Sequence, residues 1–174
     1  MAYEFFYWPE IQGRGEFVRL ALEDAGADYI DVARGLESEG RGVPAMLALM
    51  RGEGTSHIPF APPFLRDGDV IVSHTAAILL YLGGRIGLAP TDEDGRLWTH
   101  QIQLTITDIV QEVYNSHHPI DEDKWFHEQK DDGDRARRSL PQGPDAEVSW
   151  LVRADPRGEP GGRGSAGWCL CHLC

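Results

Sequence analysis

Short apolar stretches separated by turn residues follow one another along the first 88 positions of the chain. Alternating apolar positions rich in aromatic and β-branched residues predict strands, whereas apolar residues three or four positions apart predict helices. The pattern predicts strands at 3–7, 28–32, 63–66 and 70–72, and helices at 15–25, 43–50 and 75–83. The apolar face of the first helix is expected to comprise Phe17, Leu20, Ala21 and Ala25.

The order of these elements predicts an α/β domain over residues 1–88. The first two strands need a parallel pairing with a crossover helix between them. The last two strands flank Asp67-Gly68-Asp69, and an Asp-Gly step between two apolar runs predicts a hairpin. A parallel pair followed by an antiparallel hairpin and a helix is a thioredoxin-like arrangement.

The rest of the chain has a different character. A long helix is expected at 92–117, preceded by Pro90 and stopped by Pro119, so residues 89–130 are interpreted as a partial all-α C-terminal domain. Residues 131–174 contain seven glycines, four prolines and six arginines and show no sustained apolar period. Such a segment cannot bury enough apolar surface to offset its ordering entropy, so an irregular, poorly ordered tail is expected.

Charge and hydropathy narrow the range of binding partners that the chain is expected to have. The chain has 28 acidic and 16 basic residues, a net charge of −12, and an acidic chain repels nucleic-acid phosphates. No apolar run reaches the roughly 18 residues of a membrane helix. The start, MAYEFFYWPE, lacks the basic and apolar regions of a signal peptide. We therefore expect a cytoplasmic protein with neither a nucleic acid nor a membrane as partner.

Three segments carry a family resemblance: YWPEIQGRGEFVRLALEDAG, PPFLRDGDVIVSHTAAILLYLG and the helix with TITDIV. Over roughly residues 3–117 the chain resembles a cytosolic glutathione S-transferase of the tyrosine-type, bacterial-like kind, with a truncated or frameshifted C-terminal domain. The resemblance implies a homodimer that conjugates glutathione, as co-substrate and without another cofactor, to electrophilic small molecules. The alternative is a non-catalytic glutathione-binding or protein-interaction module on the same fold.

The resemblance implies that Tyr7 is the catalytic residue, whose hydroxyl donates a hydrogen bond to the glutathione sulfur. The nucleophile is the thiolate, and a free thiol has a pKa of about 8.5. The alternative is an ordinary strand aromatic. One more residue separates Tyr7 from Gly13 than in many tyrosine-type relatives, so the register of the intervening loop is open.

Glutathione binding is expected from five further residues. The resemblance implies a cis bond before Pro63 that aims the preceding backbone at the ligand, although Pro62 lacks an N–H, so one backbone hydrogen bond of the family cannot form. His74 and Thr75 occupy the family's Gln-Ser position at a helix start, which suits the γ-glutamyl carboxylate. The alternative for Pro62 and Pro63 is a turn with a trans peptide bond, and the alternative for the helix start is plain N-capping by Ser73 or Thr75.

Asp108 lies on the long helix, where the family often places an acid that reaches the glutathione amine of the neighbouring subunit. The alternative is an ordinary acid on the helix surface.

No metal site is expected. The adjacent residues His117 and His118 point in different directions from a helix end. Cys169, Cys171 and Cys174 are spaced too tightly for a structural zinc loop, and reactive thiols in the tail are the alternative.

Overall fold

The computed structural model describes residues 2–121, 124 and 126–139. The chain forms two compact units, residues 1–100 and the residues from 101 onward, each of which is described here by itself. The boundary between the units lies within the long helix, whereas the sequence predicts a boundary at residue 88. The predicted tail beyond residue 139 lies outside the described residues.

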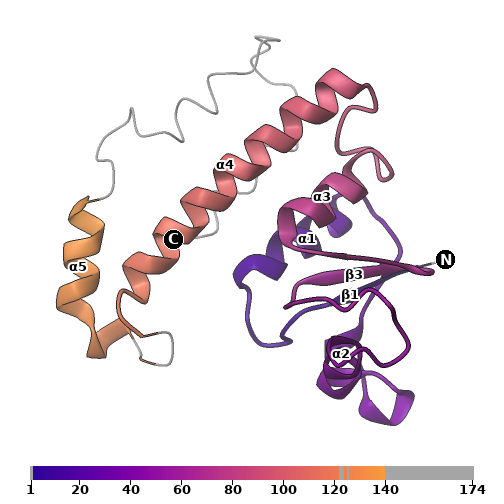
Figure 1. Ribbon diagram of the computed structural model, residues 1–174, viewed down its shortest axis with the longest axis horizontal. Helices are drawn as coiled ribbons and strands as arrows, with labels where there is room; N and C mark the ends of the chain where they lie inside the picture. Colours follow the sequence, from indigo (N-terminus) through magenta and orange to yellow (C-terminus); the bar gives the residue numbers. More distant parts are fainter. Residues whose placement is uncertain (1, 122–123, 125, 140–174) are drawn as a thin grey trace. The chain divides into compact units, whose positions relative to one another are not determined.

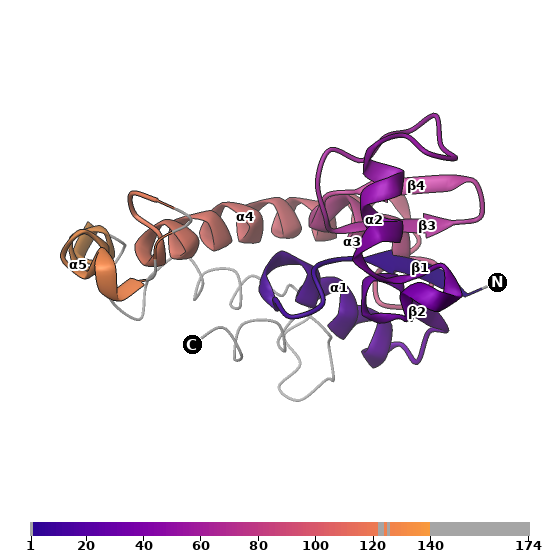
Figure 2. The same ribbon diagram turned by 90° about the horizontal axis from the view of Figure 1, so that it is seen from below.

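A four-stranded mixed sheet organises the first unit. Its strands lie in the order β2-β1-β3-β4, which can be followed in Figure 2. β1 pairs in parallel with β2 and antiparallel with β3, and β3 pairs antiparallel with β4. The bounds are β1 Tyr3–Phe6, β2 Tyr29–Asp31, β3 Phe64–Asp67 and β4 Val70–Ser73. This is the thioredoxin-like sheet that the sequence predicts.

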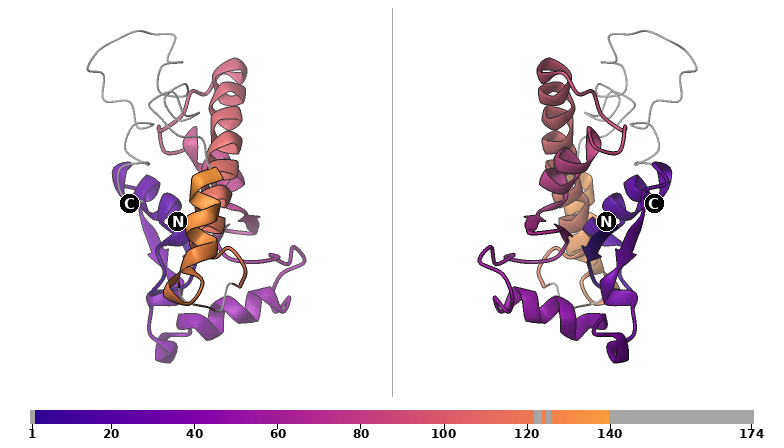
Figure 3. Two further views of the ribbon diagram at one scale, coloured as in Figure 1. Left: turned by 90° about the vertical axis from the view of Figure 1, so that its left-hand side faces the viewer. Right: turned by 90° about the vertical axis from the view of Figure 1, so that its right-hand side faces the viewer.

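Helices cover both faces of the sheet. Figure 1 shows α1 (Gly13–Asp24) and α3 (Thr75–Gly83) above the sheet and α2 (Gly42–Met50) below it, and Figure 3 shows the same arrangement from the two sides. Two 3₁₀ turns, η1 (Val32–Arg34) and η2 (Glu37–Glu39), connect β2 to α2.

The alternation of side chains along β1 and β3 divides the core into two clusters. Phe5, Tyr7 and Leu65 pack against α1 and α3. Phe6 and Phe64 face the other way, where their rings stack at 4.6 Å and pack against α2 and η1. Each helix layer is therefore fixed by one face of the same two strands.

The predicted apolar face of α1 is wrong in part. Leu20 is 43% exposed, whereas Val18 and Leu22 are fully buried. The buried residues Gly15, Val18, Arg19 and Leu22 follow the spacing i, i+3, i+4, i+7. Because a glycine and an arginine occupy two of these positions, the face is not recognisable as apolar.

The long helix α4 spans Glu93–His117 and begins one residue later than predicted. Asp92 precedes it, and its Oδ1 accepts a hydrogen bond from the Gly95 amide at 2.8 Å, which is an N-terminal side-chain cap. Within the described part of the chain, no helix is both long enough and apolar enough to cross a membrane.

A further helix, α5 (Lys130–Ser139), follows the 3₁₀ turn η3 (Phe126–Glu128). The sequence predicts an irregular tail from residue 131, and this prediction is wrong for residues 131–139. Acidic residues in the first turn favour a helix through the macrodipole, and Arg135 pairs with Asp132 at 3.3 Å. A helix supported by charge placement has no apolar period from which to predict it.

Candidate functional site

Tyr7 immediately follows β1 and is 7% exposed. Its ring lies against the first turn of α1: a Cβ added to Gly15 would lie 2.2 Å from two ring carbons. A Cβ added to Gly13, which has φ +40, would lie 2.6 Å from the Tyr7 hydroxyl. The two glycines therefore permit the tyrosine to bring its hydroxyl to the start of a helix, where the dipole favours negative charge.

The proline pair precedes β3. The Pro62–Pro63 peptide bond is cis, as predicted, and the Pro63 carbonyl accepts a hydrogen bond from the His74 amide at 3.2 Å. This bond connects the turn before β3 to the start of α3.

His74 has φ 77 and ψ 126, a backbone conformation that residues with a Cβ rarely adopt. Backbone strain of this kind costs about 1–3 kcal/mol and is found most often at functional sites. Within the described residues, no side chain caps α3, so N-capping by Ser73 or Thr75 does not explain these residues.

Thr75 is the first residue of α3, and its hydroxyl donates a hydrogen bond to the Arg14 carbonyl at 3.0 Å. The side chain thus connects the first turns of α1 and α3. The first amide groups of a helix have no intrahelical acceptors, which makes the start of α3 suited to an anion.

These contacts bring together most of the predicted site. Tyr7 contacts the first turn of α1. In that turn the Arg14 carbonyl accepts a hydrogen bond from the Thr75 hydroxyl, and the His74 amide donates a hydrogen bond to the Pro63 carbonyl. Asp108 is an exposed side chain of α4 in the other unit, so its predicted role stays a prediction.

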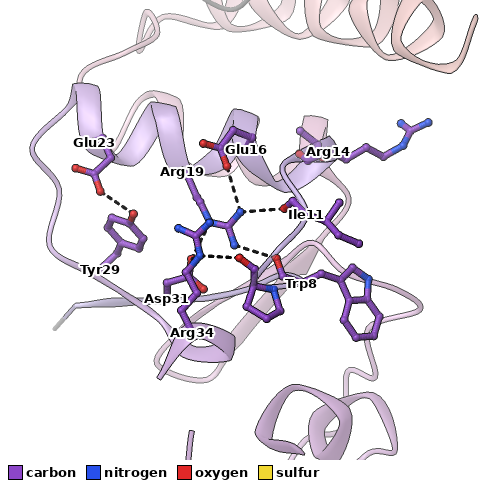
Figure 4. A network of polar contacts seen from close by, with 11 residues as sticks. Trp8, Ile11, Arg14, Glu16, Arg19, Glu23, Tyr29, Asp31 and Arg34 are labelled. Carbon is purple, nitrogen blue, oxygen red and sulfur yellow. Dashed lines mark hydrogen bonds and ion pairs between the residues drawn. The ribbon is translucent and has the colours of Figure 1, made fainter. Parts of the chain in front are cut away.

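An arginine network beside Tyr7 was not predicted from the sequence. Arg19 is 3% exposed, and its guanidinium lies among Trp8, Ile11, Glu16 and Asp31 (Figure 4). Nearby, burial and a hydrogen bond to Glu23 raise the pKa of Tyr29 to about 12. No local signal in the sequence identifies Arg19, because an arginine and a glycine on the buried face of α1 hide its apolar spacing.

The histidines at the end of α4 have protein partners. His118 stacks on Tyr114 at 4.8 Å, and His117 Nδ1 lies 2.9 Å from the Val113 carbonyl oxygen. Among the residues that the structure describes, no group of three or more histidine, cysteine or acidic side chains could hold a metal ion. The three cysteines lie outside those residues.

Comparison with known proteins identifies the fold. No protein-family model matches the chain, and no curated protein does so either. The solved structure of prostaglandin synthase D of Nilaparvata lugens is similar over 88% of this chain and 65% of its own, with a TM-score of 0.56 and 18% identity. The glutathione S-transferase from Ascaris lumbricoides is similar over 90% of this chain and 65% of its own, with a TM-score of 0.52 and 20% identity.

A glutathione transferase homolog from Sulfitobacter, solved with bound glutathione, is similar over 88% of this chain and 70% of its own, with a TM-score of 0.50 and 16% identity. The chain therefore has a glutathione transferase-like fold. It spans 65% of the length of the first two of these structures.

Gly15→Ala is expected to destabilise the protein. The new methyl group would lie 2.2 Å from the buried Tyr7 ring, and overpacking of a core costs about 1–3 kcal/mol. Chemical denaturation should show a lower midpoint than for the parent chain. The matched control is Gly84→Ala, because the nearest atom to a Cβ there is 3.9 Å away. Equal midpoints for both variants would contradict the close approach of Tyr7 to Gly15.

Proposed function

We propose that this chain is a cytosolic, tyrosine-type glutathione transferase that joins the thiolate of glutathione to electrophilic small molecules. The observation that carries the proposal is the position of Tyr7. Its hydroxyl lies beside the first turn of α1. A hydrogen bond from the Thr75 hydroxyl to the Arg14 carbonyl joins this turn to the first turn of α3. A thiolate and a carboxylate of one ligand would thus each find a helix N-terminus.

The chemistry at Tyr7 is hydrogen-bond donation to the sulfur anion. Lowering a thiol pKa by about two units requires about 2.7 kcal/mol of preferential stabilisation of the thiolate. A hydrogen bond to a charged group contributes about 1.5–3 kcal/mol. One hydroxyl together with the dipole of α1 is therefore sufficient to make glutathione a nucleophile near neutral pH.

The other predicted residues would hold the peptide. The γ-glutamyl carboxylate would lie at the N-terminus of α3, where Thr75 and His74 meet it, and the cysteinyl unit would lie along Pro62 and Pro63. The homolog from Sulfitobacter, which shares the fold, was solved with bound glutathione, and this supports glutathione as the ligand. Asp108 would reach the glutathione amine of a second subunit.

The non-catalytic glutathione-binding module remains the second candidate. It is favoured by the burial of Tyr7, which is 7% exposed, as an ordinary core aromatic is. The two functions share the anion site at α3 and differ in whether Tyr7 lowers the pKa of the thiol, so a titration of bound glutathione separates them.

Tyr7→Phe is expected to raise the pKa of bound glutathione toward its free value, with little loss of affinity, because the hydroxyl stabilises only the charged form. The measurement is the ultraviolet absorbance of the thiolate against pH at saturating glutathione. Tyr3→Phe is the matched control, since Tyr3 lies on the same strand face and packs against the same core cluster. An unchanged titration in Tyr7→Phe would contradict the catalytic role and leave the binding module.

Thr75→Val is expected to weaken glutathione binding by about 1–2 kcal/mol, because it removes a hydroxyl donor and keeps the shape of the side chain. Thr75→Ser should retain most of the affinity. Titration calorimetry gives both values, and thermal melting shows whether each variant is folded. If folded Thr75→Val binds as tightly as the parent, the hydroxyl serves only the contact with Arg14.

The proposal includes a homodimer, and the segment between α2 and β3 supports it. Phe60 is 96% exposed and Ile58 is 59% exposed, so two large apolar side chains are in contact with water. Burial of a large apolar side chain contributes about 1.5–3 kcal/mol, which a second subunit would supply.

Phe60→Ser is therefore expected to shift the protein toward monomer at a fixed concentration. Sedimentation equilibrium measures the shift. Leu36→Ser is the control, because Leu36 is a comparably exposed apolar side chain, at 64%, in another segment. A parent chain that sediments as a monomer at all concentrations would contradict the dimer.

A further inference from the structure

The loop from Trp8 to Gln12 joins Tyr7 to α1, and arginine side chains hold its backbone. Arg19 Nη2 donates to the Trp8 carbonyl at 3.3 Å, and Arg19 Nη1 donates to the Ile11 carbonyl at 3.5 Å. Arg34 Nε donates to the Pro9 carbonyl at 3.1 Å. Three carbonyls of this short loop thus accept from guanidinium groups.

Arg19 also lies over the aromatic rings at the end of β1. Its Cζ is 5.4 Å from the centre of the Phe5 ring and 5.6 Å from that of Tyr7. The ring of Tyr7 is therefore bounded by the backbone of Gly15 and by the guanidinium of Arg19. A cation over the ring face adds an attraction that holds the ring in one orientation.

The charge of Arg19 is compensated from two directions. Its Nε donates to Asp31 Oδ2 at 2.7 Å, and its Nη1 donates to Glu16 Oε2 at 3.2 Å (Figure 4). The side chain of Arg34 lies 3.5 Å from the same oxygen of Asp31. A buried guanidinium with these partners has a fixed position, because loss of any partner would leave a charge or a polar group unpaired.

We propose that Arg19 is a positioning residue that holds the Trp8–Ile11 loop and the ring of Tyr7 in the geometry that lets the tyrosine hydroxyl meet the glutathione sulfur. The inference rests on the proposed function. It depends on the planar fork of the guanidinium, which reaches two loop carbonyls and a carboxylate at once. A lysine ammonium is a point charge on a flexible stem and cannot make this set of contacts.

The test is Arg19→Lys, which keeps the charge beside Asp31 and removes the fork. The matched control is Arg66→Lys. Arg66 also pairs through its Nε with a carboxylate, that of Glu4, and lies 5.9 Å from the centre of an aromatic ring, that of Phe6, but it makes no contact with the loop among the described interactions. Two measurements are made on each variant: the pH titration of bound glutathione thiolate, and hydrogen exchange of the peptide covering residues 8–16.

Arg19→Lys is expected to raise the pKa of bound glutathione by about one unit, which is a tenfold loss of thiolate at pH values below that pKa. Exchange in residues 8–16 should become severalfold faster. Arg66→Lys should change neither quantity, even where both variants melt at a lower temperature. This pattern supports the proposal.

Two results would overturn it. If Arg19→Lys keeps the parent's thiolate pKa, whatever its melting temperature, Arg19 is a structural residue that does not position Tyr7. Equal acceleration of exchange in both variants shows a general loss of stability. If the parent chain shows no bound thiolate at all, the proposed function fails, and exchange at residues 8–16 alone decides whether Arg19 holds the loop.

Discussion

A buried positive charge organises the region around the end of β1. Removing a guanidinium from water costs several kcal/mol, and the cost is offset only when most of its N–H groups find acceptors. Arg19 finds them on three elements: Glu16 on its own helix, Asp31 at the end of β2, and the carbonyls of Trp8 and Ile11. The same condition therefore fixes the path of the β1–α1 loop, the start of α1 and the end of β2 together.

Side-chain alternation in β1 adds the second condition. Since successive residues of a strand point to opposite faces, Phe5 and Tyr7 must share one face when Phe6 occupies the other. Phe6 packs against α2, so Tyr7 is directed toward α1 and α3. There the absence of a side chain at Gly15 lets the ring approach the helix backbone. The position of the candidate hydroxyl thus follows from strand geometry and one glycine.

The sheet and its covering helices could be predicted because their patterns are local. An Asp-Gly step specifies the hairpin, and apolar runs of the right length specify strands and helices. The buried face of α1 was predicted only in part: Phe17 is buried as predicted, but Leu20 is exposed, and Gly15 and Arg19 lie on the buried face. Arg19 reads as a surface residue in the sequence, and its burial depends on acceptors outside its own helix: Asp31 and the carbonyls of Trp8 and Ile11.

The candidate site likewise has parts that could be predicted from local motifs and parts that could not. Tyr7, Pro63 and Thr75 occur in recognisable motifs, so their neighbourhood could be predicted. The hydrogen bond from Thr75 to Arg14 joins residues 61 positions apart and has no local signal. The helix α5 also lacked a local apolar signal, since acidic residues in its first turn, rather than an apolar period, favour it.

The contact between Thr75 and Arg14 has a consequence for ligand binding, because a hydroxyl has a single hydrogen. That hydrogen is donated to the Arg14 carbonyl, so a carboxylate at the start of α3 competes with the carbonyl for it. The amides at the start of α3 do not enter this competition, and they supply the first hydrogen bonds to an anion. If the hydroxyl turned to the anion, the Arg14 carbonyl would lose the hydrogen bond from Thr75 in the turn that faces Tyr7. In the proposed function, a carboxylate bound at the start of α3 would thereby be coupled through the Thr75 side chain to the backbone that surrounds Tyr7.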